Sequence, residues 1–137
     1  MKKIALLAAL IIPAMLVSCA APQTGADQTE DTLAIENPYA PQEGDEALDK
    51  GIIYFDNASW DDTTHILNVS GNLPNPCSQL RATISQGGQQ IDLTIYSVSE
   101  PEVMCAQMLQ PFEAAFKMES FDPQTFRVFI NGQEIPL

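Results

Sequence analysis

The chain has 137 residues, of which 18 are acidic, 6 are basic and 45% are hydrophobic, so it can form one small domain around a single core. Its net charge of −12 argues against nucleic-acid binding, because phosphate contacts need clustered lysine and arginine. A hydrolase of the Ser-His-Asp type would have only one histidine, His65, to use. We therefore expect neither of these two classes of protein.

The amino-terminal residues have the layout of an export signal. Lys2 and Lys3 precede the apolar run Ile4–Val17, which is shorter than the roughly 20 residues that a membrane-spanning helix needs. We predict that residues 1–18 are a signal peptide. Because that segment contains no acidic residue, the rest of the chain holds all 18 acidic residues with only 4 basic ones, and its net charge is −14.

The end of this signal, Leu16-Val17-Ser18-Cys19, resembles the bacterial lipobox, in which the cysteine is lipidated and becomes the first residue of the mature protein. The resemblance implies lipidation at Cys19 and a protein anchored to a membrane of the cell envelope, outside the cytoplasm. Two or three acyl chains hold a protein durably, whereas one chain binds only marginally. The alternative is that Cys19 is an ordinary small residue near a signal-peptidase site.

Residues 19–50 are rich in proline, glutamine and threonine, and they carry eight acidic residues against the single base Lys50. Such a segment buries too little apolar surface to offset its ordering entropy, so we predict a disordered, acidic tether that holds the domain away from the lipid. The alternative is that the acidic run is a ligand-binding tail, or that it binds cations. Whether the short apolar patch Leu33–Ile35 docks on the domain is left open.

Residues 51–137 form short apolar segments separated by turn residues, with no sustained helical period. The first predicted strand is Ile52–Phe55, and residues 56–62 either continue it or form a polar bend. A second strand, in which His65 alternates in register with apolar residues, ends at the segment Leu73-Pro74-Asn75-Pro76.

A predicted hairpin follows. Its first strand places Leu80, Ala82 and Ile84 inward and Arg81 toward solvent, Gly87-Gly88 forms the turn, and the return strand buries the odd-numbered residues of 91–95. One helical turn fits between Glu100 and Gln110.

Alternating patterns at 112–118 and 126–130 give two more strands, and Asn131-Gly132 turns the last hairpin before Ile135 and Leu137. About seven short strands in 51–137 predict an all-β domain, an immunoglobulin-like antiparallel β-sandwich. A small closed barrel is the alternative fold.

Two cysteines remain once Cys19 is assigned to lipid. Export permits disulfides, so we interpret Cys77 and Cys105 as a structural bridge. The competing interpretation is a pair of redox or metal-binding thiols, although no Cys-x-x-Cys spacing occurs.

Other candidate site residues lie between positions 56 and 65. Asp56, Asn57, Asp61 and Asp62 supply oxygen ligands of the kind that bind calcium, but they lack the register of a calcium loop, so we favour a solvated turn. We interpret His65 as a strand-face histidine near the rim rather than a catalytic base.

Trp60 is interpreted either as a core anchor or as an exposed binding residue, and the candidate binding surface combines it with Leu73, Pro74, Asn75 and Pro76. Asn57-Ala58-Ser59 and Asn68-Val69-Ser70 match the N-glycosylation pattern, and we treat both as chance matches behind a bacterial lipobox.

Several motifs together resemble a group of uncharacterised bacterial secreted and lipid-anchored domains. The matching residues are Gly71-x-Leu73-Pro74-x-x-Cys77, then Cys105, Pro111-Phe112-Glu113 and Val128-x-Ile130-Asn131-Gly132, with Ile130 in place of a second valine. The resemblance spans about residues 66–137 and implies an immunoglobulin-like fold with a Cys77–Cys105 pairing. It implies no activity, so no catalytic residue is transferred.

We therefore predict a lipid-anchored, non-enzymatic module without cofactor or metal, which binds an unidentified protein or glycan or organises the envelope. The alternative is an inhibitor of extracellular proteases that presents the stiff segment Leu73–Cys77, and an enzyme is a third hypothesis.

Overall fold

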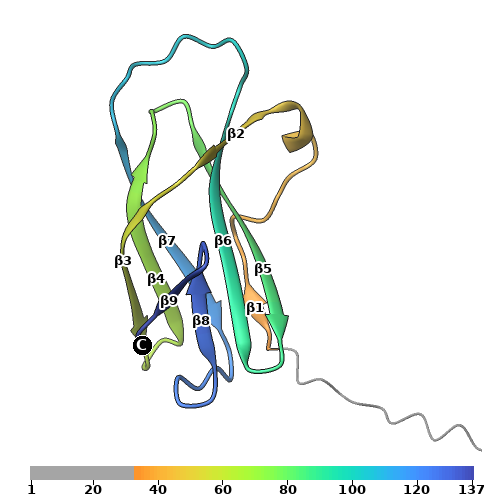
Figure 1. Cartoon of the computed structure of the whole chain (residues 1–137), viewed down its shortest axis with the longest axis vertical. Helices are drawn as coiled ribbons and strands as arrows, with labels where there is room; N and C mark the ends of the chain where they lie inside the picture. The colour runs from red at the N-terminus through yellow and green to blue at the C-terminus, as the bar shows by residue number, and fades with distance from the viewer. Residues whose placement is uncertain (1–32) are drawn as a thin grey trace, which may run out of the picture.

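The computed structural model describes residues 33–137, which form two β-sheets packed face to face (Figure 1). The predicted all-β sandwich is confirmed. The strands are β1 Ile35–Glu36, β2 Asp49–Ile52, β3 Phe55–Asp61, β4 Ile66–Leu73, β5 Gln79–Gly87, β6 Gln90–Ser99, β7 Gln110–Met118, β8 Arg127–Ile130 and β9 Gln133–Ile135, with one short 3-10 helix, η1 Asp45–Ala47. Within this range no helix is long and apolar enough to cross a bilayer.

The two sheets have different topologies. The first has the strand order β1-β7-β4-β3 and is antiparallel throughout. The second is built around β6, which pairs with β5 along one edge and with β2 and β8, one after the other, along the opposite edge. The β6–β8 pair is parallel, whereas an antiparallel sandwich was predicted. The pair is parallel because β7 ends at the end of the sandwich where β6 begins, so the chain enters the second sheet there and β8 runs in the same direction as β6.

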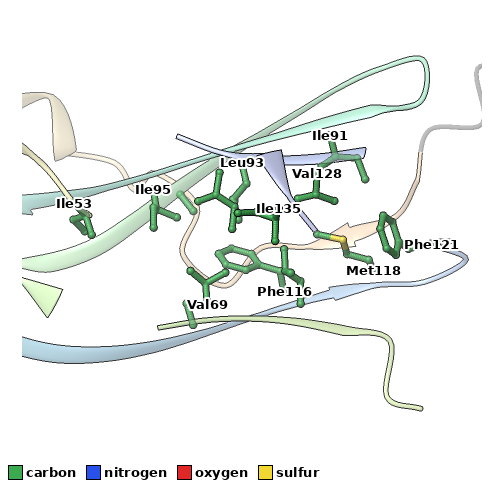
Figure 2. Close-up of a cluster of buried hydrophobic side chains, with 14 of the residues drawn as sticks. Ile53, Val69, Ile91, Leu93, Ile95, Phe116, Met118, Phe121, Val128 and Ile135 are labelled. Carbon is green, nitrogen blue, oxygen red and sulfur yellow. The ribbon is translucent and has the colours of Figure 1, made fainter. Parts of the chain in front are cut away.

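The core lies between the sheets and is built from alternate residues of the central strands (Figure 2). Full burial of each large apolar side chain contributes about 1.5–3 kcal/mol. The inward positions predicted for the later strands are confirmed, and the fully buried ones are Ile91, Leu93, Ile95, Ala114, Phe116, Met118, Val128 and Ile130.

The predicted strand Ile52–Phe55 is wrong, because the chain crosses from one sheet to the other within it. Ile52 ends β2 and Phe55 begins β3, while Ile53 between them is 1% exposed in the core. The crossing passes so close to β4 that a Cβ on Gly71 would lie 2.9 Å from the Phe55 Cα and 3.0 Å from the Tyr54 carbonyl oxygen. This close approach explains the glycine of the Gly-x-Leu-Pro-x-x-Cys motif.

Residues 33–50 belong to the folded domain, so the prediction of a tether reaching Lys50 is wrong for this part. β1 pairs with β7. The Tyr39 carbonyl accepts a hydrogen bond from the backbone amide of Ala82 at 2.7 Å, and the side-chain amide of Asn37 donates to the Ala82 carbonyl at 2.8 Å. The segment thus covers the outer edge of β5, which otherwise would offer unpaired backbone groups. Residues 19–32 lie outside the described range.

Arg81 is buried rather than solvent-facing. It is 6% exposed, and its Nε and Nη2 atoms donate to the Asp45 carboxylate at 2.7 and 3.1 Å. The hydrogen bond from Arg81, followed by the one from the Gln42 amide, lowers the pKa of Asp45 below its ordinary value. The sequence pattern predicted a solvent-facing Arg81 because its partner, Asp45, lies in the segment that was predicted to be disordered.

Both predicted hairpin turns are present. The first turn falls at Gly88–Gln89, one residue later than predicted, and the second is formed by Asn131 and Gly132, with φ of 49° and 81°. Asn131 also fills the space between β2 and β8, because its Oδ1 accepts the Ile95 amide at 2.8 Å and its Nδ2 donates to the Ile53 and Ile95 carbonyls. A side-chain amide therefore continues the ladder along β6.

Candidate functional site

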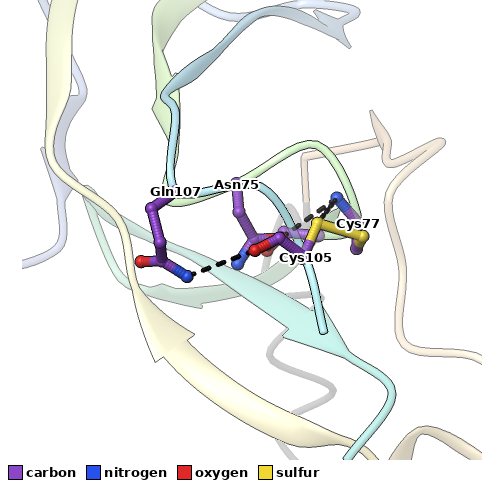
Figure 3. Close-up of a disulfide and its surroundings, with 5 residues drawn as sticks. Asn75, Cys77, Cys105 and Gln107 are labelled. Atoms are coloured by element: carbon purple, nitrogen blue, oxygen red, sulfur yellow. Dashed lines mark hydrogen bonds between the residues drawn. A yellow bond between two sulfur atoms is a disulfide. The ribbon is translucent and has the colours of Figure 1, made fainter. Parts of the chain in front are cut away.

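The disulfide end of the sandwich carries the clearest candidate site. Cys77, in the β4–β5 loop, and Cys105, in the β6–β7 loop, form a disulfide with 6.1 Å between their Cα atoms (Figure 3). Asn75 shapes the first loop, since its Oδ1 accepts hydrogen bonds from the Cys77 amide at 3.0 Å and the Ser78 hydroxyl at 3.1 Å. The predicted bridge is thus present in the structure, and it joins two loops that each cross between the sheets.

The β6–β7 loop, residues 100–109, stands almost entirely in solvent. Cys105 is its only residue that is not exposed, and the predicted helical turn is absent. Pro101 lies near the start of this segment and Pro111 just after its end, and Glu102 adopts a φ of 63°. These residues prevent a helix from forming in the loop. The disulfide is therefore the main attachment of this loop to the rest of the domain.

Large apolar side chains gather at the same end. Within residues 33–137, six of the seven exposed large hydrophobic residues lie in this half of the molecule. We call them the apolar tip: four on the β6–β7 loop, Val103, Met104, Met108 and Leu109, and two on the crossing between β2 and β3, Ile52 and Tyr54. Met104 is 100% exposed and directly precedes Cys105. Exposed apolar surface of this kind marks interaction sites.

The loop part of the apolar tip is negatively charged. Residues 100–111 contain Glu100 and Glu102 and no basic residue. Below the tip, a shallow groove of about 630 Å³ runs over the outer face of the second sheet between Ile52, Thr83, Thr94 and Tyr96. Lys50 lies at this groove with its ammonium 5.6 Å from the centre of the Tyr96 ring. The β6–β7 part of the tip thus combines four exposed apolar side chains with two glutamates, while Lys50 lies near Ile52.

The predicted binding surface is not brought together by the fold. Trp60 pairs with Leu67, six residues before Leu73 on β4, which places the two about 20 Å apart along the strand. Leu73 is 7% exposed and belongs to the core, whereas Pro74 and Pro76 are exposed in the β4–β5 loop beside the half-buried Asn75. Only this loop part of the predicted surface lies next to the apolar tip.

Trp60 lies at the opposite end, where it packs edge-to-face on Phe121 with ring centroids 4.6 Å apart. Its Nε1 donates to Asp62 at 3.1 Å. His65 is exposed in the β3–β4 turn with φ of 55°, and therefore precedes the strand in which it was predicted. Its ring lies 6.0 Å from that of Trp60.

The candidate calcium ligands are spread along β3 and its turn. Asp56 near the start of β3 accepts a hydrogen bond from Asn72, and Asp61 at its end accepts the amides of Thr63 and Thr64. These hydrogen bonds lower the pKa of Asp61, the Thr63 amide contributing most. Across residues 33–137 no group of three or more histidine, cysteine, aspartate or glutamate side chains is arranged to hold a metal ion. Cys19 lies outside the described residues.

The sequence interpretation did not single out the β6–β7 loop as a candidate interaction surface. Its signal was available in the printed residues: four large apolar residues around a cysteine, between two prolines, at spacings that fit neither strand nor helix. Apolar residues without a burial period have no face that the core can use.

Comparison with known proteins gives one match. Residues 67–136, just over half of the chain, match the family model described as the ORF11 beta-sandwich domain. The match begins in β4 and ends after β9, so it includes the two cysteines of the disulfide, Cys77 and Cys105, and the Asn131-Gly132 turn. No curated protein and no solved structure matches the chain.

Proposed function

The chain belongs to the ORF11 beta-sandwich domain family, and from that premise we propose that it is a lipid-anchored, extracytoplasmic module that binds a protein partner of the cell envelope without catalysis. The observation that carries the proposal is the apolar tip, held by the Cys77–Cys105 bond. A constrained loop loses little conformational entropy on binding, which favours affinity. Glu100 and Glu102 of the β6–β7 loop favour a partner whose apolar pocket is bordered by basic residues.

The position of the amino terminus supports an orientation in which the apolar tip faces away from the membrane. Leu33 begins the described chain at the end opposite the disulfide, where its amide donates to Gln86 and Ile35 pairs with Met118 (Figure 1). A lipid on Cys19 would hold the domain by that end, only 14 residues before Leu33. The apolar tip would then point away from the membrane, toward other envelope components.

Two experiments test the proposal, one on the purified protein and one in intact cells. Mass spectrometry of the purified protein should show an acylated Cys19 and loss of residues 1–18, and a free thiol at Cys19 would refute the anchor. A photo-crosslinking amino acid at position 104 should give a discrete protein adduct, while the same group at Gln124, exposed at the opposite end, should give none. Equal adducts at both positions, or none at 104, would contradict binding through the tip.

Inhibition of extracellular proteases is the second candidate function, and the fully exposed Met104 beside the disulfide favours it. The segment first considered for this role contains the buried Leu73, so the β6–β7 loop replaces it as the segment offered to a protease. Titration of secreted serine proteases with the full chain tests this function. No loss of protease activity at micromolar protein would reject it.

A further inference from the structure

A polar groove on the outer face of the first sheet is separate from the apolar tip. It has a volume of about 460 Å³ and is lined by side chains of three strands and of the amino-terminal segment. The lining residues are Tyr39, Asn57, Asn68, Ser70, Glu113 and Ala115, together with the buried Val69 and Ala114. None of them is basic, and only Glu113 is charged.

The two Asn-x-Ser motifs build the centre of this groove. In the antiparallel pair of β3 and β4, Asn57 lies opposite Ser70 and Ser59 lies opposite Asn68, so each asparagine of one motif faces the serine of the other. β7 extends both rows, because Glu113 pairs with Ser70 and Ala115 pairs with Asn68. Two motifs that look like chance matches in the sequence therefore form one cluster of amides and hydroxyls.

The amides of this cluster differ from the other asparagines of the domain. Residues 33–137 contain six asparagines, and four of them hydrogen-bond through their side chains to other parts of the protein: Asn37, Asn72, Asn75 and Asn131. The two that make no such bond within the described chain are Asn57 and Asn68, which both line the groove. Their donors and acceptors are available to a ligand.

We propose that this groove binds a neutral carbohydrate chain. Amides and hydroxyls both donate and accept hydrogen bonds, as the hydroxyls of a sugar do. The small side chains of Ser70 and Ala115 leave room for the ligand, and the half-buried ring of Tyr39 offers an apolar surface at the edge of the groove. The absence of basic side chains among the lining residues disfavours a phosphorylated or acidic ligand.

A peptide fits this groove less well. Extended peptides bind by adding a strand to a free sheet edge, such as that of β3. The groove instead lies on the outer face of the sheet, across β3, β4 and β7, and its central strands β4 and β7 pair with each other along eight residues. The carbohydrate site and the protein-binding tip rest on different residues, so each proposal can fail without the other.

The test uses the full chain purified in a detergent that has no sugar headgroup. The probes are neutral tetra- to hexasaccharides of β-1,4-linked glucose, xylose, mannose and N-acetylglucosamine, with binding measured by calorimetry. We expect at least one probe to bind, with an affinity that changes little between low and high salt, because the ligand is uncharged. Asn57→Ala/Asn68→Ala should weaken that affinity by about tenfold or more, which corresponds to ~1.4 kcal/mol.

The matched control is Ser85→Ala/Gln124→Ala, which removes two exposed polar side chains that line neither this groove nor the one on the second sheet. This variant should bind like the unmodified protein. Ala115→Trp provides a second test if the double asparagine variant folds poorly, since a large side chain at this exposed position would fill the groove. Absence of binding to every probe, or equal affinities for all variants, would overturn the proposal.

Discussion

The two ends of the sandwich keep their loops in place by different means. At the amino-terminal end, Phe121 is 5% exposed and packs against Trp60 and Phe126, with ring centroids 4.6 and 5.9 Å apart. At the disulfide end, the β6–β7 loop exposes its large side chains and is joined to the domain through Cys105. We call these the aromatic end and the disulfide end.

A disulfide can hold a loop whose apolar side chains are not buried. A loop that places its apolar side chains in the core is held by their burial, and those side chains are then unavailable to a partner. A loop held by a disulfide can leave its apolar side chains in solvent and still stay attached to the domain. The disulfide end therefore leaves apolar side chains in solvent, whereas the aromatic end buries its own against the core.

The largest expected effect comes from removing the central ring of the aromatic end. Phe121→Ala deletes a buried aromatic side chain, a change that typically costs 3–5 kcal/mol of unfolding free energy. At roughly 4–8 °C per kcal/mol for a domain of this size, the melting temperature should fall by about 15 °C or more. Thermal denaturation followed by circular dichroism measures this fall.

Phe129→Ala is the control for this prediction. Phe129 is only half-buried, and its ring lies under the Arg127 guanidinium, 5.4 Å away, so its loss should cost clearly less. Equal destabilisation by the two variants would show that Phe121 has no special role at the aromatic end.

Removal of the disulfide should have the next largest effect. Cys77 and Cys105 are 28 positions apart, and the chain-entropy model assigns such a bond about 3.5 kcal/mol as an upper value. Cys77→Ser/Cys105→Ser should therefore lower the melting temperature by more than about 10 °C. Limited proteolysis should also cut the variant within residues 100–109 first. An unchanged melting temperature and an uncut loop would mean that the bond does not hold this end.

Much of the fold could be predicted from the sequence, because strand periodicity and turn chemistry are local signals. The alternation at Ile91, Leu93 and Ile95 and the Asn131-Gly132 turn each identify an element without knowledge of the rest of the chain. The errors arose where a contact over a long sequence distance decides the structure. The Asp45 carboxylate, for example, has its partner Arg81 36 positions later in the chain.

The candidate sites were harder to predict for the same reason. The pairing of Cys77 with Cys105 followed from counting cysteines, but the exposure of Met104 depends on where that bond holds the loop. Likewise, the two Asn-x-Ser motifs are 11 residues apart, and only the register of β3 against β4 places Asn57 opposite Ser70. The composition shows which polar groups are present, while the strand register decides which of them line the same groove.

A smaller effect is expected from acid at the aromatic end. The Asp122 carboxylate accepts the Gln124 amide at 2.9 Å and the Thr125 hydroxyl at 2.7 Å, and these bonds, the first most strongly, hold its pKa below the usual 3.8. Because the folded-state pKa is lowered, this contribution to stability is present above the unfolded-state pKa and is lost as the pH falls through the folded-state value.

Titration of the Asp122 carboxyl by NMR should give a midpoint below 3.8, and Asp122→Asn should reduce the loss of melting temperature between pH 5 and pH 3 by a few degrees at most. Asp92 accepts only a side-chain amide, from Gln90, and Asp92→Asn serves as the control. A midpoint at or above 3.8 for Asp122 would contradict the bonding seen at this turn.

The smallest expected effect on stability is at the centre of the disulfide end. Met104 is 100% exposed, so Met104→Ser should change the unfolding free energy by no more than about 0.5 kcal/mol. The matched control is Met118→Ser, because Met118 is fully buried and its loss should destabilise the domain by several kcal/mol. If Met104→Ser lowers the melting temperature as much as Met118→Ser does, the loop packs against the domain and the apolar tip is not a free surface. If stability is unchanged while crosslinking from a neighbouring tip position such as 108 is lost, the exposed methionine contributes to binding a partner rather than to folding.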